Sequence, residues 1–477
     1  MKIYDKLGNM KVLLINPTLK NMITTCLPKY VEEERGFYPP LGLALIAGYL
    51  ENHTPFKVEI IDALAENLNS QELQIQIQQA SPDVVGITTT TFTLIDVLNI
   101  ANLVKNVNKN IYVVLGGPHC GIYPEETLSQ ESVDAVIIGE GEISFCELVK
   151  HLADDKSQIK GIGFKSNGKI FINPSQEYVQ DLDILPFPAR HLLPLNRYYS
   201  IHGQREQMTT MFSSRGCPYN CLFCYHAFGR KVRFRSPENV VDEIQEILNL
   251  GIKEVFFFDD LFTVKKDMVM GICDEIMKRK LEVVWEIRAR INTVDREMLQ
   301  KLKQAGCIRV SYGVEAGTNR ILKVLRKGIT TEQVIDVFKL TKSTGLITYA
   351  DFMIGSPSET KDEILQTIHF AQKINPDFVQ FTITTPYPHT DLYQAGLDKK
   401  IFKEDYWLKF AQYPAKDFIP QVWNENLSYD ELIELLNYAY KSFYVRPQFI
   451  LKRMLGLKSL KDFLRYAKAA VRVMKSK

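Results

Sequence analysis

The sequence predicts an α/β protein: a doubly wound parallel sheet of the flavodoxin or Rossmann type, then a partial (β/α)6 barrel and a helical C-terminal region. Three observations support this prediction. Short apolar runs alternate with helical segments in residues 10–152, the same rhythm resumes over residues 206–398, and residues 399–477 carry no strand signal. Strands that alternate with helices form parallel sheets, because a parallel connection needs a crossover of helical length.

The first unit contains five predicted strands. Each is a short run of apolar, mostly β-branched residues, which is typical of a strand buried on both faces. Segments of helical length separate them, such as residues 94–107. The predicted strands are residues 12–15, 58–61, 84–87, 112–115 and 135–138.

Residues 153–205 interrupt this alternation and are interpreted as a linker that contains a hairpin. Residues 162–172 form two short β-rich runs around Asn167-Gly168, a dipeptide typical of hairpin turns. Pro186, Pro188 and Pro194 then punctuate a stretch without periodicity.

The second unit contains six consecutive βα repeats, which predict a barrel-like parallel sheet that is incompletely closed. In such sheets the functional residues lie at the carboxyl ends of the strands. The predicted strands are residues 209–213, 254–258, 283–287, 308–314, 348–354 and 378–384.

The C-terminal region is predicted to be helical and basic. Leu457, Leu460, Leu464, Ala467 and Val471 recur at helical spacing, and residues 446–477 hold ten Lys or Arg residues against one acid. One interpretation is a solvated helix packed on the barrel. The alternative is a helix that lies on a membrane surface.

The composition is that of a soluble globular protein without an extreme charge. Lys plus Arg is 58 and Asp plus Glu is 56, for a net charge of +2, so no nucleic-acid partner is expected. The N-terminus lacks a signal-peptide pattern, and the longest apolar run is too short for a bilayer span. We therefore expect a cytoplasmic location, where a cysteine cluster indicates metal binding or catalysis rather than disulfides.

Three of the eight cysteines are clustered: Cys217, Cys221 and Cys224, spaced C-x3-C-x2-C. They follow a predicted strand directly and so lie on a loop at its carboxyl end. Thiolates hold iron–sulfur clusters, and three thiolates leave one iron of a four-iron cubane open to bind a ligand. The alternative is a structural zinc site in which His226 completes a Cys3His tetrahedron.

This triplet, on the first strand loop of a partial barrel, resembles the radical SAM superfamily, and the resemblance extends through most of the second unit. It implies a 4Fe-4S cluster that cleaves S-adenosylmethionine (SAM) reductively. Residues 313–317 resemble the family segment that contacts the SAM ribose, with Glu315 as the contact. Residues 352–360, which include Gly355, resemble the turn near the adenine.

Other positions depart from the family pattern. Where many relatives carry Gly-Gly-Glu to bind the SAM amino group, this chain has Asp259-Asp260, and Asp260 takes that contact in our interpretation. His389 stands where relatives usually carry glycine, which bears on the path of that loop. Arg288 either pairs with the SAM carboxylate or forms a surface ion pair.

Three strand ends of the first unit carry small or glycine residues. Taken alone, these strand ends are weak signals, because a nucleotide site or a core without a ligand would explain them about as well as a cofactor site. With residues 39–43 and the domain that follows, they resemble the cobalamin-binding radical SAM subfamily over nearly the whole chain. The resemblance implies that loops 88–91, 116–119 and 139–142 hold cobalamin, with Thr88, Gly116, Gly117, His119, Gly139 and Gly141 as contacts.

The cobalt is expected to lack a histidine ligand from the protein, because the motif D-x-H-x-x-G of other cobalamin modules is absent. His119 follows Gly117 and Pro118 rather than such a motif. It either contacts the corrin rim or is a capped histidine of the turn.

The expected activity is SAM cleavage coupled to methyl transfer onto an unactivated carbon of a small-molecule or lipid-like substrate. A reductant such as flavodoxin or ferredoxin would supply electrons. Two alternatives stay open: an oxidative cyclase of the magnesium-protoporphyrin monomethyl ester type, and a non-catalytic cobalamin-binding module. The aromatic residues Tyr406, Trp407 and Phe410 fit a large apolar substrate or a packed core equally well.

Overall fold

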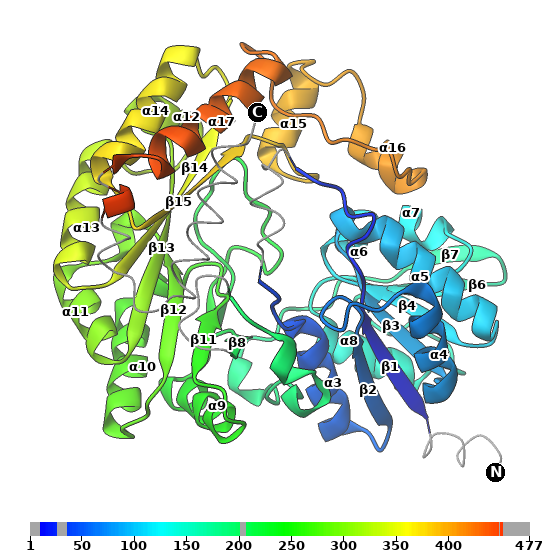
Figure 1. Ribbon diagram of the computed structural model, residues 1–477. Helices are drawn as coiled ribbons and strands as arrows, with labels where there is room; N and C mark the ends of the chain where they lie inside the picture. The colour runs from blue at the N-terminus through cyan, green and yellow to red at the C-terminus, as the bar shows by residue number, and fades with distance from the viewer. Residues whose placement is uncertain (1–9, 26–35, 201–206, 448, 452–477) are drawn as a thin grey trace.

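The computed structural model describes residues 10–25, 36–200, 207–447 and 449–451. Two βα units lie side by side, the first sheet on the right and the open barrel on the left of Figure 1, with the C-terminal helices along one end. The predicted fold class is confirmed.

The first sheet has the order β2-β1-β3-β4-β5-β6-β7, and its first five strands are parallel, as predicted. Helices α3 (Leu41–His53) and α8 (Gly141–Lys150) pack on one face, and α4 (Ser70–Ala80) and α5 (Leu94–Val107) pack on the other. The parallel strands are β1 (Lys11–Asn16), β2 (Lys57–Asp62), β3 (Val84–Thr88), β4 (Tyr112–Gly116) and β5 (Ala135–Ile137).

The hairpin, which the sequence analysis placed within the linker, pairs with the first sheet. Its strands β6 (Ile162–Ser166) and β7 (Lys169–Ile172) extend the sheet, because β6 pairs antiparallel with β5. Ile162 and Phe164 are buried in the same core as α3 and α8. We therefore propose that the first domain continues beyond residue 152 and includes the hairpin.

The second sheet has the order β15-β14-β13-β12-β11-β8, with every described pairing parallel. No pairing between β8 and β15 closes the sheet in the described part of the chain, so the barrel is partial, as predicted. The strands are β8 (Met208–Met211), β11 (Glu254–Phe257), β12 (Val284–Ala289), β13 (Cys307–Glu315), β14 (Ile347–Ile354) and β15 (Phe378–Ile383).

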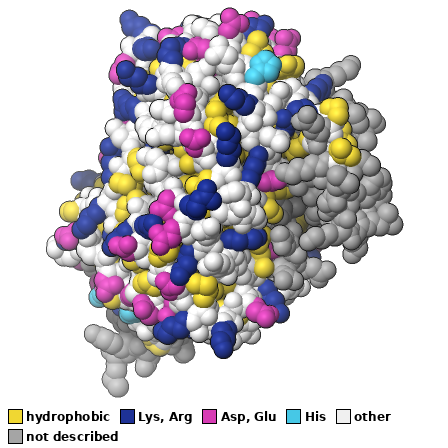
Figure 2. All heavy atoms as spheres, turned by 90° about the vertical axis from the view of Figure 1, so that its left-hand side faces the viewer, with side chains coloured by type: hydrophobic (Ala, Val, Ile, Leu, Met, Phe, Trp, Pro, Cys, Tyr) yellow, Lys and Arg dark blue, Asp and Glu magenta, His cyan; other side chains and the backbone are white. Residues whose placement is uncertain are grey.

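Six helices follow these strands and bury their apolar faces against the sheet. Figure 2 shows the side of the barrel remote from the first domain, where Lys, Arg, Asp and Glu side chains are interspersed and apolar side chains form only small groups. The helices are α9 (Pro237–Asn249), α10 (Lys266–Lys278), α11 (Arg296–Gln304), α12 (Asn319–Val324), α13 (Thr331–Ser343) and α14 (Lys361–Ile374).

The barrel unit ends in α15 (Asp391–Asp398), and the C-terminal region adds α16 (Tyr406–Gln412) and α17 (Tyr429–Tyr444). Tyr406, Trp407 and Phe410 are buried in one cluster with Tyr123 of the first unit, so core packing explains them and they join the two units. The predicted basic helix around Leu457 lies outside the described residues. None of the helices described has the length and apolarity to cross a membrane.

Candidate functional site

The cysteine loop is closed at its base by two short strands. β9 (Ser214–Arg215) pairs antiparallel with β10 (Arg233–Phe234), so residues 216–232 form an excursion from the end of β8. Buried Asp259 fixes the start of this excursion, because it accepts hydrogen bonds from the Ser213 amide (3.1 Å), the Ser213 hydroxyl (2.6 Å) and the Ser214 hydroxyl (2.5 Å). A backbone held this tightly positions the thiols that follow it.

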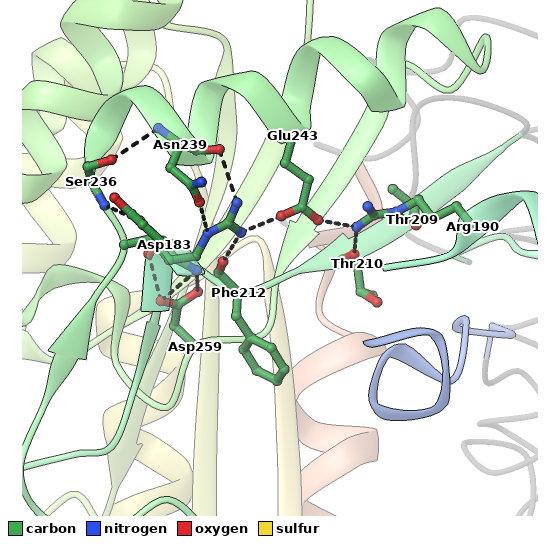
Figure 3. A network of polar contacts seen from close by, with 11 residues as sticks. Asp183, Arg190, Thr209, Thr210, Phe212, Ser236, Asn239, Glu243 and Asp259 are labelled. Carbon is green, nitrogen blue, oxygen red and sulfur yellow. Dashed lines mark hydrogen bonds and ion pairs between the residues drawn. The ribbon is translucent and has the colours of Figure 1, made fainter. Parts of the chain in front are cut away.

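A second polar network anchors the linker beneath this loop (Figure 3). The guanidinium of Arg190 donates to the Thr210 carbonyl (2.7 Å) and to Glu243 (2.5 Å), and Glu243 also pairs with Arg235. Arg235 in turn donates to the Phe212 carbonyl at 2.8 Å. The linker, β8 and α9 are thereby held together at the point where the cysteine loop begins.

The cysteine loop is also joined to the first domain by buried charges. Strand pairing sets Arg215 opposite Arg233, and their repulsion is offset by Glu140, which accepts from Arg215 at 3.0 Å and from Arg233 at 2.9 Å. Arg215 also pairs with Glu142 at 2.5 Å. Burial raises the pKa of Glu142, but the charge and hydrogen bond of Arg215, the backbone hydrogen bond and the charge of Arg233 together outweigh it, and the pKa is lowered. Glu140 and Glu142 thus bind the cysteine loop.

The three cysteines differ in exposure: Cys221 is buried, Cys217 is half-buried and Cys224 is exposed. A hydrogen bond from Cys224, with help from the charges of Lys327 and Arg290 and against the effect of burial, lowers the pKa of Cys221 to about 5. Among the described residues, no His, Cys, Asp and Glu side chains are grouped as ligands of a single metal ion.

Two cationic residues that the sequence analysis missed lie beside these cysteines. The Arg290 guanidinium donates to the Cys221 sulfur (3.1 Å), and the Lys327 ammonium donates to Glu315 (2.7 Å). Glu315 has a φ of 72°, and a Cβ on Gly313 would lie 2.4 Å from its carboxylate, so this glycine makes room for the pair. Lys327 belongs to a turn without a strand signal, which is why the pattern of strands did not reveal it.

Asp351 is a third residue that was missed. It alternates on β14 with the core residues Ala350 and Phe352, so its side chain faces the barrel interior. Burial and the charge of Glu315 raise its pKa to about 7, although Arg288 and Lys327 oppose this. The interior of the barrel therefore gathers acidic and basic groups next to the cysteine loop.

The other predicted SAM contacts have varied surroundings. Asp260 accepts a hydrogen bond from the Gly216 amide (3.0 Å) and so holds the turn before Cys217. Arg288 is exposed over the rings of Phe256 and Phe258, and no ion pair of Arg288 occurs in the described part of the chain. The surface ion pair, one of the two alternatives for Arg288, is thus not seen among the described residues.

Two predicted loops have left-handed backbone conformations. Gly355 has a φ of 73°, and a Cβ there would lie 2.8 Å from Leu432 of α17, so glycine also allows this helix to pack. His389 has a φ of 60° at the position where relatives usually carry glycine. The histidine adopts the conformation that glycine favours, so the loop can follow the path that glycine would permit.

Most of the predicted cobalamin contacts border one cavity of about 230 Å³ between the first sheet and the cysteine loop. Phe212, Tyr225 and Phe228 form its wall on the cysteine-loop side. Tyr225 also borders a second cavity of about 440 Å³, which contains Cys221 and Cys224. The predicted contacts that line the first cavity are Thr88, Gly116, Gly117, Gly139 and Gly141.

His119 is not among the residues that line either cavity. Its Nδ1 lies 3.0 Å from the Thr91 hydroxyl, and burial lowers its pKa to about 3. These surroundings favour a buried turn histidine over a corrin contact. Gly117 has a φ of 117°, and a Cβ on it would lie only 2.5 Å from the carbonyl oxygen of Thr89, so its close approach is to protein.

Comparison with known proteins agrees with both units. Residues 211–371 match the radical SAM superfamily, and residues 29–149 match the B12 binding domain. An uncharacterized methyltransferase of Pyrococcus horikoshii is 37% identical over 450 residues, which cover 93% of this chain and 94% of that protein. The chain belongs to the cobalamin-binding radical SAM enzymes.

Further relatives of this radical SAM enzyme differ in activity. The anaerobic magnesium-protoporphyrin IX monomethyl ester cyclase of Rubrivivax gelatinosus is 30% identical over 88% of this chain and 76% of its own length. Two solved structures share the fold. The first is TsrM from Kitasatospora setae, which is 18% identical with a TM-score of 0.66 and matches 82% of this chain and 75% of its own. The second is OxsB, which is 17% identical with a TM-score of 0.75 and matches 99% of this chain and 73% of its own.

Proposed function

We propose that this radical SAM enzyme methylates an unactivated carbon of a small-molecule substrate. One observation carries the proposal: the cavity at the strand ends of the B12-binding domain and the cavity of the cysteine loop share Tyr225 and Gly139 as walls. A substrate near this junction would be within reach of groups held on both sides. The methyltransferase relative, matched over 94% of its length, supports the same reaction.

The residues present fit a 4Fe-4S cluster and cobalamin. Thiols are the donors that iron–sulfur clusters use, and Cys217, Cys221 and Cys224 share one firmly held loop. In the first domain, Gly42 and Gly139 leave open space in the cavity wall, because a Cβ on either would meet no atom within 4 Å. When bound, the cluster supplies an electron for SAM cleavage, and cobalamin supplies a methyl carrier.

SAM would be bound by the charged groups at the mouth of the barrel. Glu315, which is paired with Lys327 through one oxygen, can accept from ribose hydroxyls with the other, and Arg288 is an exposed cation available for the SAM carboxylate. Asp260 would act through the turn that it holds, in addition to any contact with the amino group. Gly355 would lie near the adenine by resemblance to the family.

The first cavity offers no histidine from the described residues as a ligand for cobalt. Buried His119 lines neither cavity, so we propose a cobalt without a histidine ligand from the protein. The Co(II) EPR spectrum of the cobalamin-loaded protein tests this, because a histidine ligand would add nitrogen superhyperfine splitting. We also propose that the enzyme is cytoplasmic and draws electrons from a flavodoxin or ferredoxin.

Product mass tests the reaction. The anaerobically reconstituted enzyme is incubated with SAM, a reductant and an extract of its source organism, and the products are compared by mass spectrometry. Methylation adds a methyl group to a compound of the extract, whereas oxidative cyclisation removes hydrogen. A product of the second kind would favour the cyclase activity of the Rubrivivax relative.

A further inference from the structure

Arg290 connects the cysteine loop to the SAM side of the barrel. It follows directly after β12 and is only 6% exposed. Its Nη1 donates to the Cys221 sulfur at 3.1 Å, its Nη2 donates to the Lys327 carbonyl, and its guanidinium lies 3.8 Å from the centre of the Tyr219 ring. Tyr219 itself lies between Cys217 and Cys221, so the loop contacts this side chain at two points.

The surrounding backbone holds the same alignment. The Leu222 amide donates to the Leu325 carbonyl at 3.1 Å, so the cysteine loop docks on the turn that ends at Lys327. Lys327 in turn pairs with Glu315. Arg290 is therefore not a mobile surface side chain; three separate groups fix its guanidinium against the sulfur of Cys221.

A donor in this position acts differently on the two redox states of an iron–sulfur cluster. Reduction adds negative charge to the cluster and its sulfur ligands, and hydrogen bonds to those sulfurs are one of the factors that set the potential. A guanidinium keeps its positive charge at every pH relevant to the enzyme, so its effect does not depend on protonation. A buried cationic donor stabilises the reduced state more than the oxidised state.

We propose that Arg290 is a positioning residue that raises the reduction potential of the cluster by donating a hydrogen bond to the Cys221 sulfur. This inference rests on the proposed cluster at Cys217, Cys221 and Cys224. It assigns Arg290 to the electron-transfer step and not to SAM binding. The same side chain also donates to the Lys327 carbonyl, so it fixes the cysteine loop and the turn of Lys327 relative to each other.

The test is an anaerobic redox titration of the reconstituted enzyme without SAM, followed by EPR of the reduced cluster. In R290Q, which keeps a donor but loses the charge, the ratio of reduced to oxidised cluster at a fixed potential should fall roughly tenfold, or about 59 mV for one electron. R290K, which keeps the charge but loses the planar fork, should fall between R290Q and the unmodified enzyme. R296Q removes an exposed arginine of α11 and should leave the potential unchanged.

Each outcome decides the matter. If R290Q and R290K retain four irons per chain at the original potential, the proposal is wrong. It is also wrong if R290Q weakens SAM binding tenfold without a shift in potential, since Arg290 would then be a SAM contact. If R290Q loses iron, R290K with full iron content supplies the same comparison. Absence of a cluster in the unmodified protein would instead refute the proposed function.

Discussion

Gly42 offers a direct way to test the cobalamin site without disturbing the fold. It lies in the first turn of α3 and lines the cavity of about 230 Å³, and a Cβ placed on it has no atom within 4 Å. Its φ is not in the left-handed region, so a side chain brings no backbone strain. Replacing a helical glycine gains at most about 1 kcal/mol in helix propensity.

Leucine at this position would occupy space that the ligand needs. Losing the burial of an apolar group as large as a leucine side chain costs about 1.5–3 kcal/mol, which corresponds to roughly a ten- to hundredfold higher Kd. G42L should therefore lose affinity for cobalamin by this factor and unfold no earlier than the unmodified protein. G42A adds a single methyl group and serves as the matched control, with affinity close to that of the unmodified protein.

The assay is a titration of the purified protein with hydroxocobalamin, read by the absorbance of bound corrinoid, together with a thermal melt. Unchanged affinity in G42L would refute the assignment of this cavity. A lower melting temperature in G42L would refute the inference that a side chain at this position has room in the folded protein. Gly117 is a poorer choice than its sequence context suggests, because a side chain there would collide with the backbone of Thr89 at 2.5 Å.

Three further predictions follow from the site. Cys217→Ala, Cys221→Ala and Cys224→Ala should each abolish SAM cleavage and bound iron, whereas Cys273→Ala, in the core of the barrel, should keep both; iron retained in any of the three would contradict the assignment. Glu140→Ala leaves Arg233 and the Val179 amide without their carboxylate. The free energy of unfolding, measured by denaturant titration, should therefore fall by about 3–5 kcal/mol. A fall of less than about 1 kcal/mol, which is typical of surface ion pairs, would count against a buried network. Asp351→Asn should raise the melting temperature at pH 8 but not near pH 4. The native pKa of about 7 lies above that of the unfolded chain, so the stability that Asp351 contributes at low pH is lost as pH rises through 7. An equal change at both pH values would refute this.

Both sheets could be predicted from the sequence because buried parallel strands are continuous apolar runs, such as 84–87 and 112–115. The sheet to which the hairpin belongs could not be predicted, because an Asn-Gly turn predicts a hairpin but not the strand beside which it lies. The antiparallel pairing of β6 with β5, such as Ile162 with Ile137, assigns it to the first sheet.

The candidate site was predicted where a motif is local and missed where partners are distant in sequence. The cysteines, Glu315 and the glycine loops lie in short recognisable segments. Arg290 contacts Cys221 across 69 residues, and the pairing of Arg215 with Glu142 spans 73 residues, so neither contact has a local signal. Glu140 and Glu142 lie in the predicted cobalamin loop 139–142 because glycines adjoin them in the sequence. In the structure, their carboxylates bind arginines.

The central claim is that SAM cleavage and methyl transfer occur in one enzyme. It is tested by incubating the reconstituted, cobalamin-loaded enzyme anaerobically with a reductant, an extract of the source organism and SAM that carries a deuterated methyl group. We predict that 5′-deoxyadenosine and S-adenosylhomocysteine form together, and that a product carries the deuterium label. Formation of 5′-deoxyadenosine without S-adenosylhomocysteine, and with no label in any product, would contradict the account.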